Sequence, residues 1–212
     1  MPADVRRRHT SRALHKLHRR YGMTAPRIAP LDPEHLAPKV RELLDALPDT
    51  ALRTANITTT LARHPELLAA SFPLSTMLLY AGTLPDRDRE LVILRTAHLA
   101  GSAYIHAQHV RIGHLAGLTP AEIARTAAGP GADDWSAHEA ALLTAADELH
   151  HHACISEATW QRLAQHYGEQ QLIEVSVLAG HYRMWAAALN SFGVTPDPAP
   201  PTAEREVSDA TG

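Results

Sequence analysis

Apolar residues recur at the three- and four-residue spacing of amphipathic helices along most of the chain. No stretch alternates apolar and polar residues between turn signals, as a half-buried strand would. The segment from Asp86 to Ala100 is apolar on nearly every side, which is typical of a helix buried at the centre of a bundle. The pattern therefore predicts an all-α fold with one central helix.

Polar residues at the ends of these runs indicate where helices begin. Four hydroxyl residues each precede an apolar run and are suited to cap its first turn: Ser102, Thr119, Ser136 and Ser156. Thr119 and Ser136 are followed three residues later by glutamate, which is the pattern of a capping box. Glycines such as Gly101 and Gly193 indicate helix ends.

Prolines divide the N-terminal half into helices. Asp32-Pro33-Glu34 is a helix start, and we predict that this helix continues until Pro48. Pro65 opens a further helix, which we predict to be kinked at Pro73 and closed by Gly82. The helical domain predicted in this way spans residues 31–194.

The segments on either side of this domain differ in composition. Residues 1–30 are rich in arginine, and we predict a basic, partly flexible arm that is solvated or clasps a neighbouring subunit, rather than one that binds nucleic acid or lipid. Residues 195–212 are rich in proline and polar residues and lack an apolar period, so we predict a disordered tail.

The overall composition limits the classes of function that the protein can have. The net charge is −3, which argues against a nucleic-acid-binding protein. The one cysteine, Cys154, excludes an internal disulfide and dithiol chemistry, and we interpret it as inert. No window approaches the roughly 20 apolar residues of a membrane span, and no signal sequence is evident, so we expect a cytoplasmic protein without a membrane partner.

The candidate chemistry lies in the stretch GSAYIHAQH, residues 101–109. At helical spacing Ser102, His106 and His109 share one face. Glu90 lies at the start of the preceding apolar helix. Two histidines and a glutamate are suited to proton transfer near neutral pH.

A metal site is the other interpretation of these histidines. His106 and His109 supply only two ligands, and a third would have to come from Glu90, His98 or His181. The spacing alone does not favour a metal, and we predict none. We interpret the run from His150 to His152 as structural, because histidines at a helix C-terminus interact favourably with the helix dipole.

Two long runs resemble the carboxymuconolactone decarboxylase family, which includes the alkylhydroperoxidase AhpD. They are RDRELVILRTAHLAGSAYIHAQHVRIGHLAG and QLIEVSVLAGHYRMWAAALNSFGV, and the likeness extends over about residues 35–194. The peroxidase motif of that family is Glu, eleven residues, Cys, two residues, Cys, three residues, His. Its positions here are Glu90, Ser102, Ile105 and His109. Serine and isoleucine cannot cycle through a disulfide, so we predict that the chain is not a thiol peroxidase.

The resemblance then implies the cysteine-free, decarboxylase-like branch. It implies a small AhpD-like helical bundle that assembles into trimers or hexamers, with a pocket near subunit interfaces and acid–base chemistry without cofactor. The substrate class would be a small carboxylated lactone or a related organic acid. We expect His109 to be the general acid/base and Glu90 its partner. The expected substrate contacts are His106, Ser102, Tyr104, His98, Arg95 and His181.

Other interpretations stay open from the sequence. Arg95, Arg111 or Arg183 could hold a substrate carboxylate. The same proton-transfer residues would serve a cofactor-free isomerase, cyclase or dehydratase, and release of CO₂ separates these from a decarboxylase. A non-catalytic helical oligomer is the third hypothesis. Self-association is expected in each case, because an apolar stripe looks exposed at Leu74, Met77, Leu78 and Leu79.

Overall fold

The computed structural model describes residues 22–23, 25–46 and 50–198, and within them it contains helices and no strand. The predicted all-α fold is therefore confirmed. Residues 1–21 of the predicted basic arm and residues 199–212 of the predicted tail lie outside the described residues. None of the described helices is long and apolar enough to cross a membrane.

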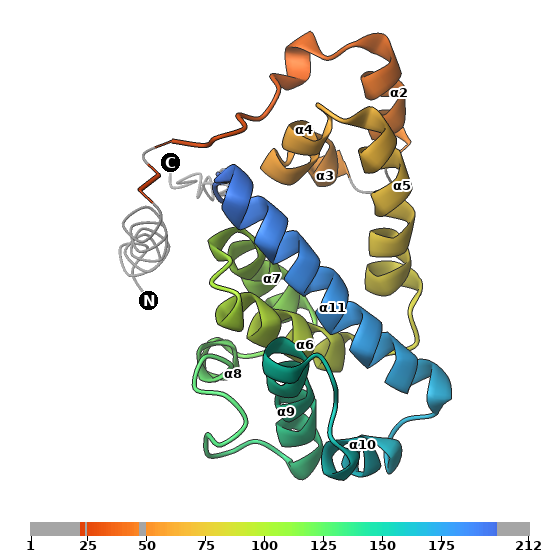
Figure 1. Ribbon diagram of the computed structural model, residues 1–212, viewed down its shortest axis with the longest axis vertical. Helices are drawn as coiled ribbons and strands as arrows, with labels where there is room; N and C mark the ends of the chain where they lie inside the picture. The colour runs from red at the N-terminus through yellow and green to blue at the C-terminus, as the bar shows by residue number, and fades with distance from the viewer. Residues whose placement is uncertain (1–21, 24, 47–49, 199–212) are drawn as a thin grey trace, which may run out of the picture.

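Short helices form the N-terminal part of the described chain, in the upper part of Figure 1. They are the 3-10 helix η1 (Pro33–His35), α2 (Pro38–Asp45), α3 (Thr50–Thr54), α4 (Asn56–Leu61), α5 (Pro65–Thr76) and the π-helix η2 (Met77–Ala81). Pro65 opens α5 and Gly82 follows η2, as predicted, while Pro73 lies inside α5.

The predicted single helix from Pro33 to Pro48 is wrong. The chain turns to extended conformation at Leu36 (ψ 141°) and Ala37 (ψ 147°), and α2 starts afresh at Pro38. A proline clashes with the helical conformation of the residue before it, so Ala37 is driven out of the α region. Pro38 can open a helix but not continue one, and it therefore splits the segment in two.

The larger helices of the C-terminal part surround a central helix, α6 (Asp86–Leu99). Every residue of α6 from Asp88 to Ala97 is buried, which confirms the predicted central helix. The helices packed against α6 are α7 (Ala103–Leu115), α9 (Ala137–His152) and α11 (Glu169–Phe192). In Figure 1 α11 runs diagonally across the bundle, with α8 (Pro120–Arg125) and α10 (Glu157–Ala164) near the lower end.

The core is built from aliphatic side chains of these four helices. Leu91 and Ile93 of α6, Leu142 of α9 and Leu178 of α11 are each 0% exposed. Burying one such side chain contributes roughly 1.5–3 kcal/mol relative to leaving it in water. This packing holds α6 and α7 rigidly side by side, and the candidate catalytic residues lie on these two helices.

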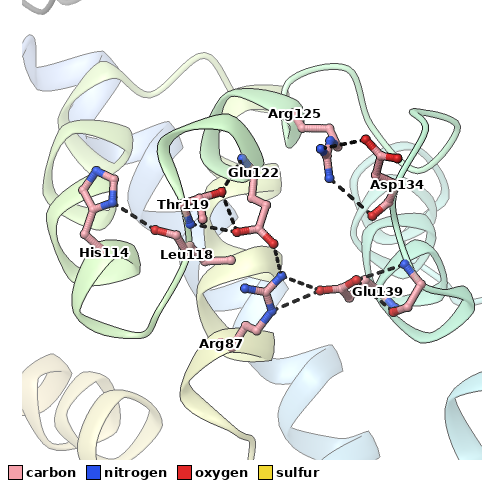
Figure 2. A network of polar contacts seen from close by, with 9 residues as sticks. Arg87, His114, Leu118, Thr119, Glu122, Arg125, Asp134 and Glu139 are labelled. Carbon is pink, nitrogen blue, oxygen red and sulfur yellow. Dashed lines mark hydrogen bonds and ion pairs between the residues drawn. The ribbon is translucent and has the colours of Figure 1, made fainter. Parts of the chain in front are cut away.

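The predicted caps are confirmed, and one arginine joins two of them. The side chains of Ser102, Thr119, Ser136 and Ser156 each accept a hydrogen bond from a backbone N–H of the first turn. Figure 2 shows how Glu122 and Glu139, the glutamates of the two capping boxes, both accept from Arg87 of α6, at 2.5 and 2.7 Å. Arg87 thus ties the N-termini of α8 and α9 to the central helix.

The start of the predicted disordered tail, residues 195–198, is instead held against the bundle. Asp197 accepts hydrogen bonds from the backbone N–H of Asn56 (2.7 Å), the hydroxyl of Tyr104 (2.9 Å) and the amide of Gln108. The proline-rich composition did not reveal this contact, because it depends on one carboxylate meeting donors from α4 and α7.

The apolar stripe predicted on α5 and η2 is only partly exposed. Leu74 and Met77 are about 40% exposed (41% and 39%), whereas Leu78 is buried and Leu79 packs partly against the core. Leu78 and Leu79 therefore belong to the inside of this chain, contrary to the prediction.

Candidate functional site

Helices α6 and α7 bring Glu90 and His109 into direct contact. His109 Nδ1 lies 2.7 Å from Glu90 Oε2. Glu90 is 0% exposed and His109 is 5% exposed. Ser102 caps α7 and Gly101 adopts a φ of +63°, which turns the chain sharply between the two helices. This turn makes α7 pack along α6 and places His109 opposite Glu90.

The buried carboxylate of Glu90 has a second partner, Arg89. Arg89 Nε donates to Glu90 Oε1 at 3.1 Å, and Arg89 Nη1 donates to the exposed Asp86 at 2.6 Å. A buried charge is tolerated only where it is paired and hydrogen-bonded. Arg89 therefore explains how Glu90 remains in the core. This role of Arg89 was not predicted from the sequence, where the one signal is its place directly before Glu90 in an otherwise apolar helix.

The contact with Glu90 fixes the tautomer of His109. Since the carboxylate can only accept, Nδ1 carries the proton and donates it to Glu90 Oε2. Nε2 of His109 then has its lone pair available, and no described residue forms a hydrogen bond with it. The ring of Tyr182, from α11, stands edge-on to the imidazole with centroids 4.9 Å apart and an interplanar angle of 89°. The arrangement suits a general base or acid that acts through Nε2.

Of the predicted substrate contacts, His106 lies near His109, and His98 lies near His106. His106 is half-buried, and its pKa is lowered by burial and by the neighbouring His98 and His109. His98 is exposed at the end of α6, and its pKa is lowered by partial burial and by Arg95. Both shifts favour the neutral imidazole, which can donate or accept a hydrogen bond.

Ser102 and Tyr104 have structural partners. Ser102 is 1% exposed, and its hydroxyl caps α7 by accepting from the backbone N–H of Ile105 at 3.4 Å. The Tyr104 hydroxyl donates to Asp197, and burial and this carboxylate raise the pKa of Tyr104. Both side chains stabilise α7 and its surroundings.

Arg95 and His181 form their hydrogen bonds with residues other than Glu90 and His109. The guanidinium of Arg95 forms two hydrogen bonds to Asp147 (2.5 and 3.0 Å) and donates to the carbonyls of Thr126 and Ala127. These hydrogen bonds hold Arg95 within the fold, and its contact with a substrate carboxylate stays a prediction. His181 lies 3.0 Å from Ser75 and accepts from the indole of Trp185 at 3.0 Å, without contact to His109.

Two other arginines had been considered as carboxylate anchors. Arg111 donates to the side chain of Gln108 at 3.3 Å, and Arg183 donates to the carbonyl of Leu149 at 3.0 Å. Both are exposed. The guanidinium that contacts the Glu90–His109 pair is that of Arg89.

The remaining histidines and the cysteine form no metal site among the described residues. No group of three or more His, Cys, Asp or Glu side chains in residues 22–23, 25–46 and 50–198 is arranged to hold a metal ion. The rings of His150, His151 and His152 contact one another at the end of α9. Cys154 is exposed in the loop that follows.

The comparison with protein families identifies the part of the chain that holds the site. Residues 65–148 match the model of the carboxymuconolactone decarboxylase family. This match supports a carboxymuconolactone decarboxylase/AhpD-like family for the matched segment. The matched segment runs from the start of α5 to near the end of α9 and includes both Glu90 and His109, while Tyr182 lies beyond it. A search of curated proteins gives no match.

Solved structures with the same fold include AhpD-like proteins. An AhpD-core, peroxidase-related protein from Ralstonia eutropha JMP134 superposes with a TM-score of 0.69 at 19% identity, covering 80% of this chain and 93% of that one. A peroxidase-related protein from Silicibacter sp. TM1040 has a TM-score of 0.70 at 15% identity, covering 82% and 95%. The debrominase Bmp8 has a TM-score of 0.65 at 15% identity, covering 80% and 91%. At these identities the likeness shows the AhpD-like helical fold.

Proposed function

We propose that the protein is a cofactor-independent, decarboxylase-like lyase that acts on a small carboxylated lactone or a related organic acid. The observation that carries the proposal is the 2.7 Å contact between His109 Nδ1 and the fully buried Glu90 carboxylate. This contact leaves Nε2 as the reactive nitrogen of an oriented imidazole. The match of residues 65–148 to the model of the carboxymuconolactone decarboxylase family supports the reaction class.

The proposed reaction needs one proton donor and an electron-accepting carbonyl on the substrate. The bond to the substrate carboxylate breaks, CO₂ leaves, and the electron pair passes through a conjugated double bond to the lactone carbonyl oxygen. The pair then returns to carbon, which takes a proton from His109 Nε2. For this step His109 is an imidazolium that carries protons on both nitrogens and faces the Glu90 carboxylate; after it has given up the Nε2 proton, Nε2 takes a new proton from water.

Thiol chemistry is not part of the proposal. Ser102 and Ile105 stand at the two cysteine positions of the peroxidase motif, and the single cysteine of the chain, Cys154, is exposed after α9. The proposed site therefore depends on proton transfer, which the Glu90–His109 pair is built to perform.

The experiment that tests the proposal compares His109→Gln with His152→Gln, an exposed histidine in the C-terminal turn of α9. Purified variants are assayed for CO₂ release on a panel of carboxylated lactones. We expect His109→Gln to lower kcat by about 10²-fold or more and His152→Gln to keep the wild-type rate. Wild-type turnover by His109→Gln on a confirmed substrate would remove His109 from the mechanism. Turnover without CO₂ would indicate an isomerase, cyclase or dehydratase instead.

A further inference from the structure

Three tyrosines are buried in the described part of the chain, and their hydroxyls differ. The hydroxyl of Tyr104 donates to Asp197 at 2.9 Å, and that of Tyr167 donates to Asp88 at 2.6 Å. Buried tyrosine hydroxyls usually find such a partner. The hydroxyl of Tyr182 forms no hydrogen bond with any described residue, although Tyr182 is only 7% exposed.

The position of Tyr182 is next to the reactive imidazole. Its ring contacts the ring of His109, with centroids 4.9 Å apart, and comes from α11, a helix that packs on both α6 and α7. Neither the Tyr182 hydroxyl nor His109 Nε2 is among the described side-chain atoms that are enclosed without a partner. Tyr182 is 7% and His109 5% exposed, so each of these adjacent residues keeps a small surface from which a ligand can approach.

The surroundings keep the Tyr182 hydroxyl protonated. Burial raises the pKa of Tyr182 well above its ordinary value, and the neighbouring Glu90 adds to this rise, while Arg89 opposes it. A protonated phenol is a hydrogen-bond donor, so near neutral pH the Tyr182 hydroxyl can donate. What this donor lacks within the described chain is an acceptor, and a substrate oxygen would supply it.

We propose that Tyr182 is a second catalytic residue, whose hydroxyl donates a hydrogen bond to the carbonyl oxygen of the substrate beside His109. The inference rests on the proposed function. As CO₂ leaves, the electron pair moves onto this oxygen, and the hydrogen bond strengthens with the developing negative charge. His109 then protonates carbon and the charge on the oxygen disappears. The ligand class is a small planar carbonyl compound whose oxygen carries charge in the transition state.

The alternative is that Tyr182 only packs against His109. The variant Tyr182→Phe separates the two roles, because it keeps the ring and removes only the hydroxyl. The matched control is Tyr167→Phe, because the Tyr167 hydroxyl donates to Asp88 and is not part of the proposed site. We expect Tyr167→Phe to lower the melting temperature and to leave kcat unchanged below that temperature. We expect Tyr182→Phe to leave the melting temperature unchanged and to lower kcat roughly 10- to 1000-fold, while KM rises by no more than about 10-fold.

Binding of a non-reactive probe gives a readout that does not need turnover. The probe is the saturated lactone 5-oxotetrahydrofuran-3-carboxylic acid, titrated by calorimetry or NMR. Loss of one hydrogen bond predicts a Kd that rises about 3- to 10-fold in Tyr182→Phe and stays unchanged in Tyr167→Phe. Equal affinity of Tyr182→Phe and wild type, or no binding to wild type, would overturn the assignment of Tyr182.

The two proposals fail in different ways. If His109→Gln is inactive and Tyr182→Phe has full kcat, the role of Tyr182 is wrong and the proposed function stands. If both variants turn over a confirmed substrate at the wild-type rate, the proposed function itself is wrong. A lower melting temperature of Tyr182→Phe would mean that the hydroxyl has a protein partner, which also contradicts the inference.

Discussion

Glu90 is the residue on which the site depends most, because a charged carboxylate with 0% exposure needs every partner it has. His109 takes one oxygen and Arg89 the other. Removing the partner of a buried charge costs more than removing the pair, since it leaves the remaining charge uncompensated. The series of contacts from Asp86 through Arg89 and Glu90 to His109 thus stabilises the fold and also orients the imidazole.

A double-mutant cycle tests this interdependence. We expect Arg89→Met to lower the free energy of unfolding by about 3 kcal/mol, because it leaves the Glu90 carboxylate with one partner in the core. Arg89→Met combined with Glu90→Gln should cost less than the sum of the two single variants, by roughly 1 kcal/mol or more. Urea unfolding of the four proteins measures the cycle. Strict additivity would show that the two side chains do not interact.

The sequence was sufficient to pair Glu90 with His109, since both retain the positions of a known family motif. The contacts of Arg89 with Glu90 and of Tyr182 with His109 could not be predicted from the sequence, for a physical reason. Adjacent residues on a helix point about 100° apart, so spacing does not indicate that the side chain of Arg89 folds back onto Glu90. Tyr182 meets His109 only through the packing of α11, 73 positions further along the chain. The ion pair between Arg95 and Asp147 was not predicted either, because the sequence does not show that these two side chains, 52 residues apart, face each other.

At the level of helices, Arg87 has an unusual role, since it serves two N-termini at once. The glutamates of both capping boxes use one oxygen for their own helix and the other for Arg87 (Figure 2). Caps were readable from the sequence, because each is a local pattern of four residues. The break at Pro38 was not predicted, because the apolar residues keep a helical period across it. The hydrogen bonds of Arg87 were not predicted either, because they join residues that are far apart in the sequence.

We expect Arg87→Met to lower the free energy of unfolding by about 2 kcal/mol, because two part-buried carboxylates lose a charged hydrogen bond. Arg125→Met is the control, since Arg125 pairs with Asp134, which is 79% exposed (Figure 2). It should cost about 0.5 kcal/mol or less. Chemical denaturation measures both. A cost for Arg87→Met no larger than that of Arg125→Met would contradict the role of Arg87 as a joint between helices.

The hydrogen bond between Arg87 and Glu122 also makes the stability of the fold depend on pH. Hydrogen bonds from Arg87 and from Thr119 lower the pKa of Glu122 from 4.5 to about 2. A carboxyl whose pKa is depressed in the folded state stabilises the fold above its unfolded pKa, and this contribution is lost as the pH falls. We expect the stability difference between wild type and Glu122→Gln to be full above pH 4.5 and to shrink between pH 4.5 and 2. Thermal unfolding across that range measures it, and a constant difference would exclude this cause.

For the whole molecule, the outer side of α11 is the feature that the single chain leaves unexplained. Ile173, Val177 and Met184 are 60%, 41% and 52% exposed, and the exposed Gly180 lies between them. A Cβ at Gly180 would meet nothing within 4 Å in this chain. Glycine inside a helix costs about 1 kcal/mol relative to alanine, so the chain keeps it here without an internal reason. We propose that a second copy packs against this stripe, in line with the predicted homo-oligomer.

The variants Met184→Glu and Gly180→Ala test this proposal. In a monomer, Gly180→Ala should stabilise the fold by roughly 0.5–1 kcal/mol. In an oligomer that uses this stripe, it should weaken association, and Met184→Glu should shift the protein toward monomer because it buries a charge in an apolar contact. Light scattering coupled to size-exclusion chromatography gives the mass. A wild-type monomer at micromolar concentration would overturn the proposal.

Asp197 has a consequence for how the chain is made. It completes the start of α4 through Asn56, 141 residues earlier, and holds Tyr104 of α7, 93 residues earlier. Contacts that distant in sequence form late, because the intervening chain must first be ordered. On the ribosome, α4 and α7 emerge long before α11 and Asp197 follow. Helix α7, which carries His109, therefore gains the hydrogen bond from Tyr104 to Asp197 only when nearly all of the bundle has been synthesised.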